Sequence, residues 1–132
     1  MLVTALRWTI HFQDEKGFAL IVVVQILSIV FFFLIAGTIF SYVLKAGQVT
    51  GEKIYAAVCV YLLVGLLWGF LYSLTYTLQP DSFNIENNDL FQFIYYSYIT
   101  LSTLGYGDIT PLSAPAKALA YVEALTGQIY LT

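Results

Sequence analysis

The most distinctive chemistry in this chain belongs to residues 103–108, which read TLGYGD. Gly105 and Gly107 can take left-handed backbone angles at little cost, so alternating residues can turn successive carbonyl groups toward one side. Carbonyl groups in a row can replace the hydration shell of a bare cation. The loop therefore predicts a path for cations lined by main-chain oxygens.

The composition around this loop is that of a membrane protein. Hydrophobic residues make up 60% of the 132 residues and charged residues 10%, with a mean hydropathy of +0.82, whereas soluble domains have about 25% charged residues. Residues 17–44 and 54–80 carry no charged side chain, and each stretch exceeds the roughly 20 residues that span a bilayer. The five basic residues are scattered along the chain, so we expect no nucleic-acid partner.

These stretches predict the elements that must position the loop. A first membrane helix is expected over residues 18–44 and an outer helix over 54–79, joined by the segment 45–53, whose Thr50 is a candidate cap. Gly65 and Gly69 in the outer helix have the spacing that lets another helix approach closely. Tyr72, Tyr76 and Phe83 are expected at the level of the lipid headgroups.

The stretch before the glycines is too short to cross the membrane. Asn88 or Asp89 can cap a helix over residues 90–102, and about 13 residues suit a re-entrant half-helix rather than a span. Irregular backbone at membrane depth is tolerated only where it is buried in protein or lines an aqueous path. Residues 103–108 should therefore face water or ions, and a further helix, capped by Ser113, is expected over residues 114–132.

The stretch TLGYGD resembles the signature sequence of potassium channels, with Leu104 where valine or isoleucine is more frequent. The resemblance implies an all-α membrane protein with a re-entrant pore helix and a selectivity-filter loop in a tetrameric pore. It also implies that main-chain carbonyls and the Thr103 hydroxyl bind K⁺. The filter residues would be Thr103, Leu104, Gly105, Tyr106 and Gly107.

The same resemblance assigns roles to residues around the filter. Tyr95 and Tyr96 would form an aromatic cuff around Tyr106. Asp108 would attract cations at the outer mouth and tether the filter, although Ile99 stands where some members place a glutamate that bonds this aspartate. In the inner helix, Gly127 matches a family hinge and Gln128 would face the cavity.

Glu123 is the one carboxylate expected at membrane depth, where a charge costs about 2.5 to 3.5 kcal/mol. Two interpretations stay open for it. The side chain could line the cavity and concentrate cations. It could instead stay protonated and hydrogen-bond to a pore-helix hydroxyl of Ser97, Thr100 or Ser102.

The expected domains are an N-terminal segment over 1–17, an additional membrane helix with its loop over 18–53, and a pore domain over 54–132 with an incomplete inner helix. The loop 45–53 holds Lys45 and Lys53, while residues 80–89 carry only acidic charges. The positive-inside rule then places this loop in the cytoplasm and the filter mouth on the extracellular side of the plasma membrane.

The predicted function is passive, potassium-selective conduction by a homotetramer in a lipid bilayer, with K⁺ as the permeant ion and without a cofactor. The alternatives are a less selective cation channel and a subunit that does not conduct without partners. An enzyme is disfavoured because His11 is the sole histidine and no nucleophile with a base is evident.

Overall fold

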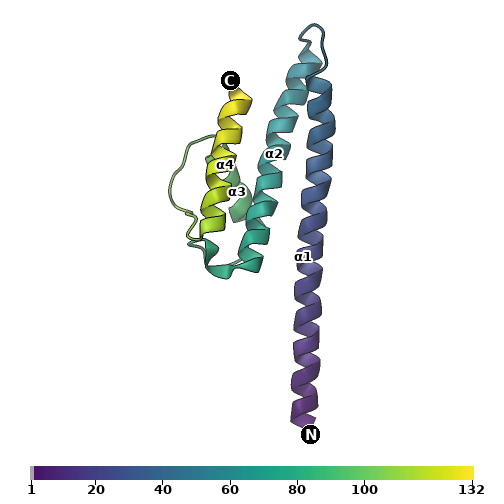
Figure 1. The fold of residues 1–132 in the computed structure, drawn as a ribbon, viewed down its shortest axis with the longest axis vertical. Helices are drawn as coiled ribbons and strands as arrows, with labels where there is room; N and C mark the ends of the chain where they lie inside the picture. The colour runs from purple at the N-terminus through teal and green to yellow at the C-terminus, as the bar shows by residue number, and fades with distance from the viewer. Residues whose placement is uncertain (1) are drawn as a thin grey trace.

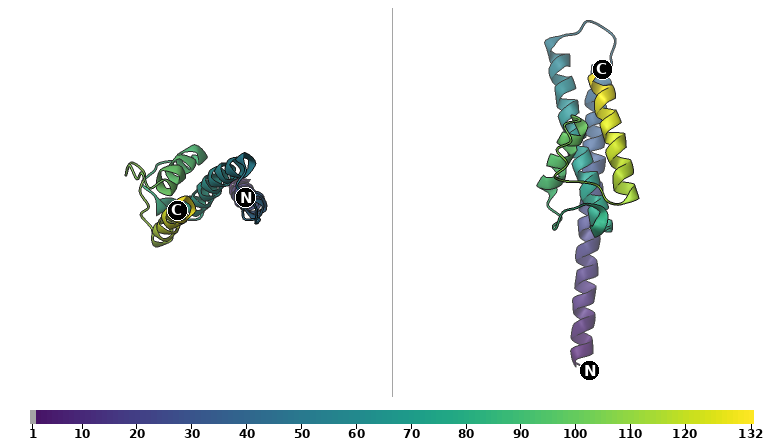
Figure 2. Two further views of the ribbon diagram at one scale, coloured as in Figure 1. Left: turned by 90° about the horizontal axis from the view of Figure 1, so that it is seen from above. Right: turned by 90° about the vertical axis from the view of Figure 1, so that its left-hand side faces the viewer.

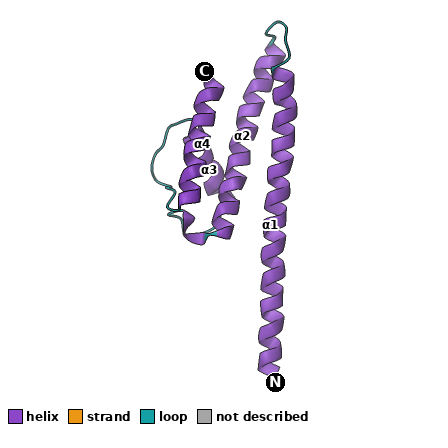
Figure 3. Cartoon of the chain, in the orientation of Figure 1, coloured by secondary structure: helices purple, strands orange, loops and turns teal. Residues whose placement is uncertain are grey.

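The computed structural model describes residues 2–132, and side chains from Glu15 onward, so the side chains of Arg7 and His11 lie outside the description. The described residues contain four α-helices and one 3₁₀ turn, joined by loops, and no strand occurs among them (Figures 1 and 3). The expected all-α fold is confirmed. The elements are α1 (Leu2–Val43), α2 (Gly51–Leu78), η1 (Pro80–Ser82), α3 (Leu90–Leu101) and α4 (Ala114–Leu131).

The first helix is longer than predicted. It begins at Leu2 rather than near residue 18, so the segment 1–17 is, from Leu2 onward, the first part of α1. The polar run before Gly17 contains glutamine, glutamate and lysine, which are good helix formers, and one glycine costs only about 1 kcal/mol. Figure 1 shows this part of α1 running past the ends of the other helices.

Helices α1 and α2 form an antiparallel hairpin. Thr50 caps α2 as predicted, because its side chain accepts a hydrogen bond from the Lys53 amide. Phe32 and Phe70 stack between the two helices with ring centroids 5.4 Å apart. Two segments of the described residues, Glu15–Val43 and Gly51–Leu78, are long and apolar enough to cross a membrane.

The short helix α3 is packed against glycines of α2, as the spacing of those glycines predicted. A Cβ atom on Gly65 would lie 2.2 Å from the Tyr98 ring, and one on Gly69 would lie 3.0 Å from the Ile94 Cα. A side chain at either position would force Tyr98 or Ile94 to shift, so glycine permits this close contact. The two glycines therefore fix how near α3 lies to α2.

The aromatic residues at the end of α2 form a core rather than an interfacial belt. Tyr72, Tyr76 and Phe83 are buried together with Phe93 and Tyr96. Tyr72 meets Tyr96 edge-on at 4.9 Å, and Phe83 meets Phe93 edge-on at 5.3 Å, which is the favoured geometry of aromatic pairs. The three residues are therefore packing residues, and their level relative to the lipid headgroups stays a prediction.

Candidate functional site

The loop between α3 and α4 carries the predicted filter and lies on one face of the molecule. In Figure 1 and in the left view of Figure 2 it runs on the side of α3 and α4 remote from α1. All of residues 103–108 are exposed in the single chain. Leu104 and Tyr106 keep 56% and 67% of their surface accessible, which is a large apolar exposure for an ordered loop.

Residues with positive φ alternate along this loop with residues that lack it, as the glycine spacing predicted. The φ angles of Gly105 and Gly107 are +55° and +77°. Thr103 also has a positive φ of 60°, whereas Leu104 and Tyr106 do not. Alternation of this kind lets successive carbonyl groups turn toward one side of the chain.

Thr103 is strained, and its neighbours hold it. A left-handed conformation costs a residue with a side chain about 1–2 kcal/mol, and such strain persists only where the surroundings determine it. The Thr103 amide donates to the Thr100 carbonyl at 2.9 Å, and the Gly105 amide donates to the Ile99 carbonyl at 3.1 Å. The start of the loop is thus fixed to the last turn of α3.

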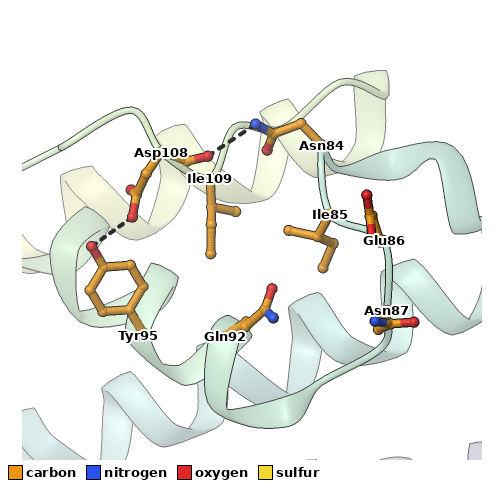
Figure 4. Close-up of a pocket in the computed structure, with 8 residues that line it drawn as sticks. All are labelled: Asn84, Ile85, Glu86, Asn87, Gln92, Tyr95, Asp108 and Ile109. Carbon is orange, nitrogen blue, oxygen red and sulfur yellow. Dashed lines mark hydrogen bonds between the residues drawn. The ribbon is translucent and has the colours of Figure 1, made fainter.

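The outer end of the loop is held by side chains from two other segments. The Tyr95 hydroxyl donates to the Asp108 carboxylate at 2.7 Å, and the Asn84 amide donates to the Asp108 carbonyl at 3.0 Å (Figure 4). The Tyr95 hydrogen bond holds the pKa of Asp108 below its usual range. Tyr95 therefore makes the link to Asp108 that Ile99 cannot make.

A cavity of about 490 Å³ opens beside this tether. Its lining contains two carboxylates, Asp108 and Glu86, and no basic residue. Amide side chains of Asn84, Asn87 and Gln92 complete its polar lining (Figure 4). The outer side of the loop is consequently an electronegative surface.

The two predicted cuff residues point to different places. Tyr95 is 39% exposed and bonds Asp108, whereas Tyr96 is 5% exposed and packs edge-on against Tyr72 and Phe83. Tyr96 also lines a small pocket with Gly105 and Gly107, so it stands behind the loop. The exposure of Tyr106 leaves its ring without a cover from its own chain.

Glu123 is fully buried and does not line an open space in this chain. One carboxyl oxygen accepts a hydrogen bond from the Tyr72 hydroxyl, and the other lies 2.5 Å from the Ser97 hydroxyl. The Ser97 oxygen also lies 2.8 Å from the Gly65 carbonyl. The carboxyl group therefore joins α2, α3 and α4.

Counting protons at Ser97 indicates the state of Glu123. A serine hydroxyl has one proton, and the Gly65 carbonyl can only accept. If Ser97 donates to Gly65, its bond with Glu123 needs a proton from the carboxyl group. All three contacts are hydrogen bonds together only when Glu123 is a neutral acid. Tyr72 then donates to Glu123, Glu123 donates to Ser97, and Ser97 donates to the Gly65 carbonyl.

The remaining predicted residues of the inner helix face α3 and the loop. Gly127 is buried in α4, and a Cβ atom there would lie 1.9 Å from the Leu101 carbonyl oxygen. Gln128 donates a hydrogen bond to the Thr103 hydroxyl at 3.3 Å. Gly127 is thus a point of close backbone contact, and its hinge role stays a prediction.

Sequence reasoning missed two residues of this site, Tyr72 and Asn84. Asn84 both donates to Asp108 and accepts from the Thr110 amide at 2.6 Å. It lies in a loop rich in polar residues, where no spacing singles it out. An acidic residue at membrane depth needs a partner. Glu123 was therefore the one signal in the sequence that a buried donor such as Tyr72 had to exist.

Comparison with known proteins gives a family match. A family model described as "Ion channel" matches residues 19–132. Two-pore potassium channels 4 and 2 of Arabidopsis thaliana are 38% and 34% identical to this chain over 73 residues. The aligned region covers 54% of this chain in both cases and 25% and 15% of those proteins.

A third relative is potassium channel K2 of Plasmodium falciparum isolate 3D7, 36% identical over 47 residues. That alignment covers 36% of this chain and 3% of the relative. The chain thus spans a quarter or less of each of these relatives. No solved structure gives a significant match.

Proposed function

This chain belongs to the ion channel family, and from that premise we propose that it is a subunit of a potassium-selective channel that conducts K⁺ passively. The observation that carries the proposal is the loop 103–108, whose alternating backbone follows a half-helix too short to span a bilayer. The names of its relatives, all potassium channels, favour K⁺ as the ion. The family is one of membrane transport proteins rather than enzymes.

Conduction requires several copies of the chain, because one loop cannot enclose an axis. We propose a homotetramer with the filter at the centre. The exposure of Leu104 and Tyr106 supports this assembly, since neighbouring subunits would cover them. The position of α1 on the side remote from the loop leaves the central face free (Figures 1 and 2).

In this assembly the carbonyl groups of residues 103–107 and the Thr103 hydroxyl replace the water around K⁺. Asp108 attracts cations at the entrance and is held by Tyr95. Gln128, next to Thr103, offers its amide at the inner end of the filter. An aromatic cuff for Tyr106 then comes from a neighbouring subunit.

Glu123 supports the filter in this proposal without binding the ion. Its burial favours the protonated interpretation over a cation-concentrating role in the cavity. Through Tyr72 and Ser97 it ties α4 to the two helices that face it. Gly127 lets the end of α3 contact α4 directly.

The proposed location is the plasma membrane, with the filter mouth outside the cell. Lys45 and Lys53 lie in and next to the turn between α1 and α2, where the Lys53 ammonium donates to the Lys45 carbonyl at 2.7 Å. Basic residues favour the cytoplasmic side. The loop 45–53 is therefore placed in the cytoplasm, and the lipid bilayer surrounds α1 and α2.

Ion flux in liposomes tests the function, comparing K⁺ and Na⁺ gradients for the chain and two glycine variants. Gly105→Ala introduces a side chain at φ +55°, although no atom lies within 4 Å of the new Cβ. The conformational cost of about 1–2 kcal/mol corresponds to a loss of K⁺ flux of about 5- to 30-fold. Gly37→Ala is the matched control, because it lies in α1 with open space and no positive φ.

Flux of K⁺ far above that of Na⁺, lost in Gly105→Ala and kept in Gly37→Ala, supports the proposal. Equal flux of the two ions indicates a less selective cation channel. If the assembled protein carries no current under any gradient, it is a subunit that needs partners, and the proposal of an autonomous channel is wrong.

A further inference from the structure

Gln25 differs from the other polar residues in the apolar part of α1. Ser28, Thr38 and Ser41 each donate to a carbonyl four residues earlier in their own helix. Gln25 is 8% exposed, and its amide nitrogen instead reaches α2. A polar group at membrane depth is costly unless it is bonded, and these hydrogen bonds tie Gln25 to α2.

The contact is part of a closed ring of hydrogen bonds that we name the Gln25 ring: Gln25, Ser73, Thr77 and Asn88. The Gln25 amide donates to the hydroxyls of Ser73 at 2.8 Å and Thr77 at 3.0 Å. Ser73 donates to the Asn88 carbonyl oxygen at 2.9 Å, and the Asn88 amide donates to Thr77 at 2.6 Å.

The proton count of the ring is consistent. Gln25 uses both of its N–H protons, and Ser73 uses its single proton on Asn88. Thr77 accepts twice and gives its own proton to the Ser73 carbonyl at 2.9 Å. Within the ring, only the Gln25 carbonyl oxygen is buried without a partner, so this side chain is held through its amide nitrogen.

The ring connects α1 to the start of the pore helix. Asn88 directly precedes Asp89, whose side chain caps α3 by accepting from the Phe91 amide at 3.0 Å. The direction of α3 at its first turn therefore depends on where Asn88 is held. From the other end of α3, the main chain leads directly into the loop 103–108.

We propose that Gln25 is a positioning residue through which the docking of α1 sets the N-terminal end of the pore helix and thereby the filter. In this view α1 is a working part of the pore and not only an extra anchor in the lipid. The effect on the filter rests on the proposed function, whereas the effect on the pore helix does not.

Amide hydrogen exchange of the full chain in lipid nanodiscs tests the structural step. Gln25→Leu removes both donors and keeps a side chain of similar size. We expect exchange in residues 84–93 to become about 5- to 30-fold faster. Ser28→Ala is the matched control one turn away, because its hydroxyl bonds only to its own helix, and it should leave this segment unchanged.

A double substitution separates positioning from general loosening. Asn88→Ala opens the same ring, so Gln25→Leu should add little in that background, since residues of one network are not additive. Additive effects, or equal exchange in Gln25→Leu and the Ser28→Ala control, would overturn the inference. If Gln25→Leu does not assemble, Thr77→Val opens the ring from α2 and serves for the same comparison.

The functional step is tested by the ratio of K⁺ to Na⁺ flux in liposomes. Loss of a merely structural contact would lower the amount of assembled protein and leave the ratio unchanged, whereas Gln25→Leu should lower the ratio itself. An unchanged ratio despite faster exchange overturns the link to the filter. Absence of flux in the unsubstituted chain refutes the proposed function instead, and the exchange result still decides the docking of α3.

Discussion

Replacing Glu123 by glutamine distinguishes a neutral side chain that donates a proton from a charge that attracts cations. A glutamine amide can donate to Ser97 through its nitrogen and accept from Tyr72 through its oxygen, as the protonated acid does. Its second N–H is the only new group to accommodate. Without an acceptor this N–H costs about 1–3 kcal/mol, so we expect Glu123→Gln to lose no more stability than that.

Glu123→Leu has a larger effect, because the site is fully buried. Ser97 still has the Gly65 carbonyl as an acceptor at 2.8 Å, but the Tyr72 hydroxyl loses its partner. An unsatisfied buried donor costs about 1–3 kcal/mol, which corresponds to about 5- to 150-fold in the equilibrium between assembled and unfolded protein. Glu123→Leu also loses both hydrogen bonds of the carboxyl group, which Glu123→Gln keeps, so the order of stability is original, glutamine variant, leucine variant.

Both variants are measured by thermal unfolding of the assembled protein in detergent and by K⁺ flux in liposomes. Glu52→Gln, the same chemical change at an exposed position, controls for loss of a charge. We expect flux in Glu123→Gln to match the original chain. The contrary result is a flux that falls as far in Glu123→Gln as in Glu123→Leu, with Glu52→Gln unaffected. It would refute the protonated state of Glu123 and favour the cation-concentrating role.

Two further substitutions test the supports of the loop. Gly127→Ala places a Cβ atom 1.9 Å from the Leu101 main-chain oxygen. This contact should destabilise the fold by about 1–3 kcal/mol, measured as a lower unfolding temperature than in Gly37→Ala. Tyr95→Phe removes the hydrogen bond that depresses the pKa of Asp108. A depressed pKa keeps the Asp108 carboxylate charged, and its hydrogen bond with Tyr95 formed, until the pH falls through that pKa. The variant should therefore lose K⁺ flux at a higher external pH, nearer the usual aspartate pKa of about 3.9, and an unchanged pH profile would contradict the role of Tyr95.

The starts of α2, α3 and α4 were predictable from the sequence because their causes are local. Thr50, Asp89 and Ser113 cap α2, α3 and α4 through side chains that accept from amides two or three residues on. Short polar side chains before apolar runs encode this bond directly. The left-handed angles of Gly105 and Gly107 were predictable for the same reason, since they depend on the residue type itself.

Contacts between segments distant in sequence were not predictable in this way. Tyr72 near the end of an apolar helix fits a headgroup position as well as a core position. Its burial depends on contacts with Phe83 and Tyr96, which are distant in the sequence. For Glu123, Ser97 was one of three candidate partners, and Tyr72 was not among them. The start of α1 was missed because polar residues end a membrane stretch without ending a helix.

Contacts with the rest of the chain determine the position of α3 most closely. The proposed filter explains why this helix is held so firmly. An ion site made of main-chain carbonyls cannot be tuned by changing side chains, so its geometry depends on where the backbone before it is held. Glycines of α2 receive one face of α3, the Glu123 carboxyl group bonds its middle, and the Leu101 carbonyl meets Gly127 at its end. The Gln25 ring fixes the remaining end beside Asn88. Substitutions at these contacts should therefore alter ion discrimination although none of the residues touches the ion.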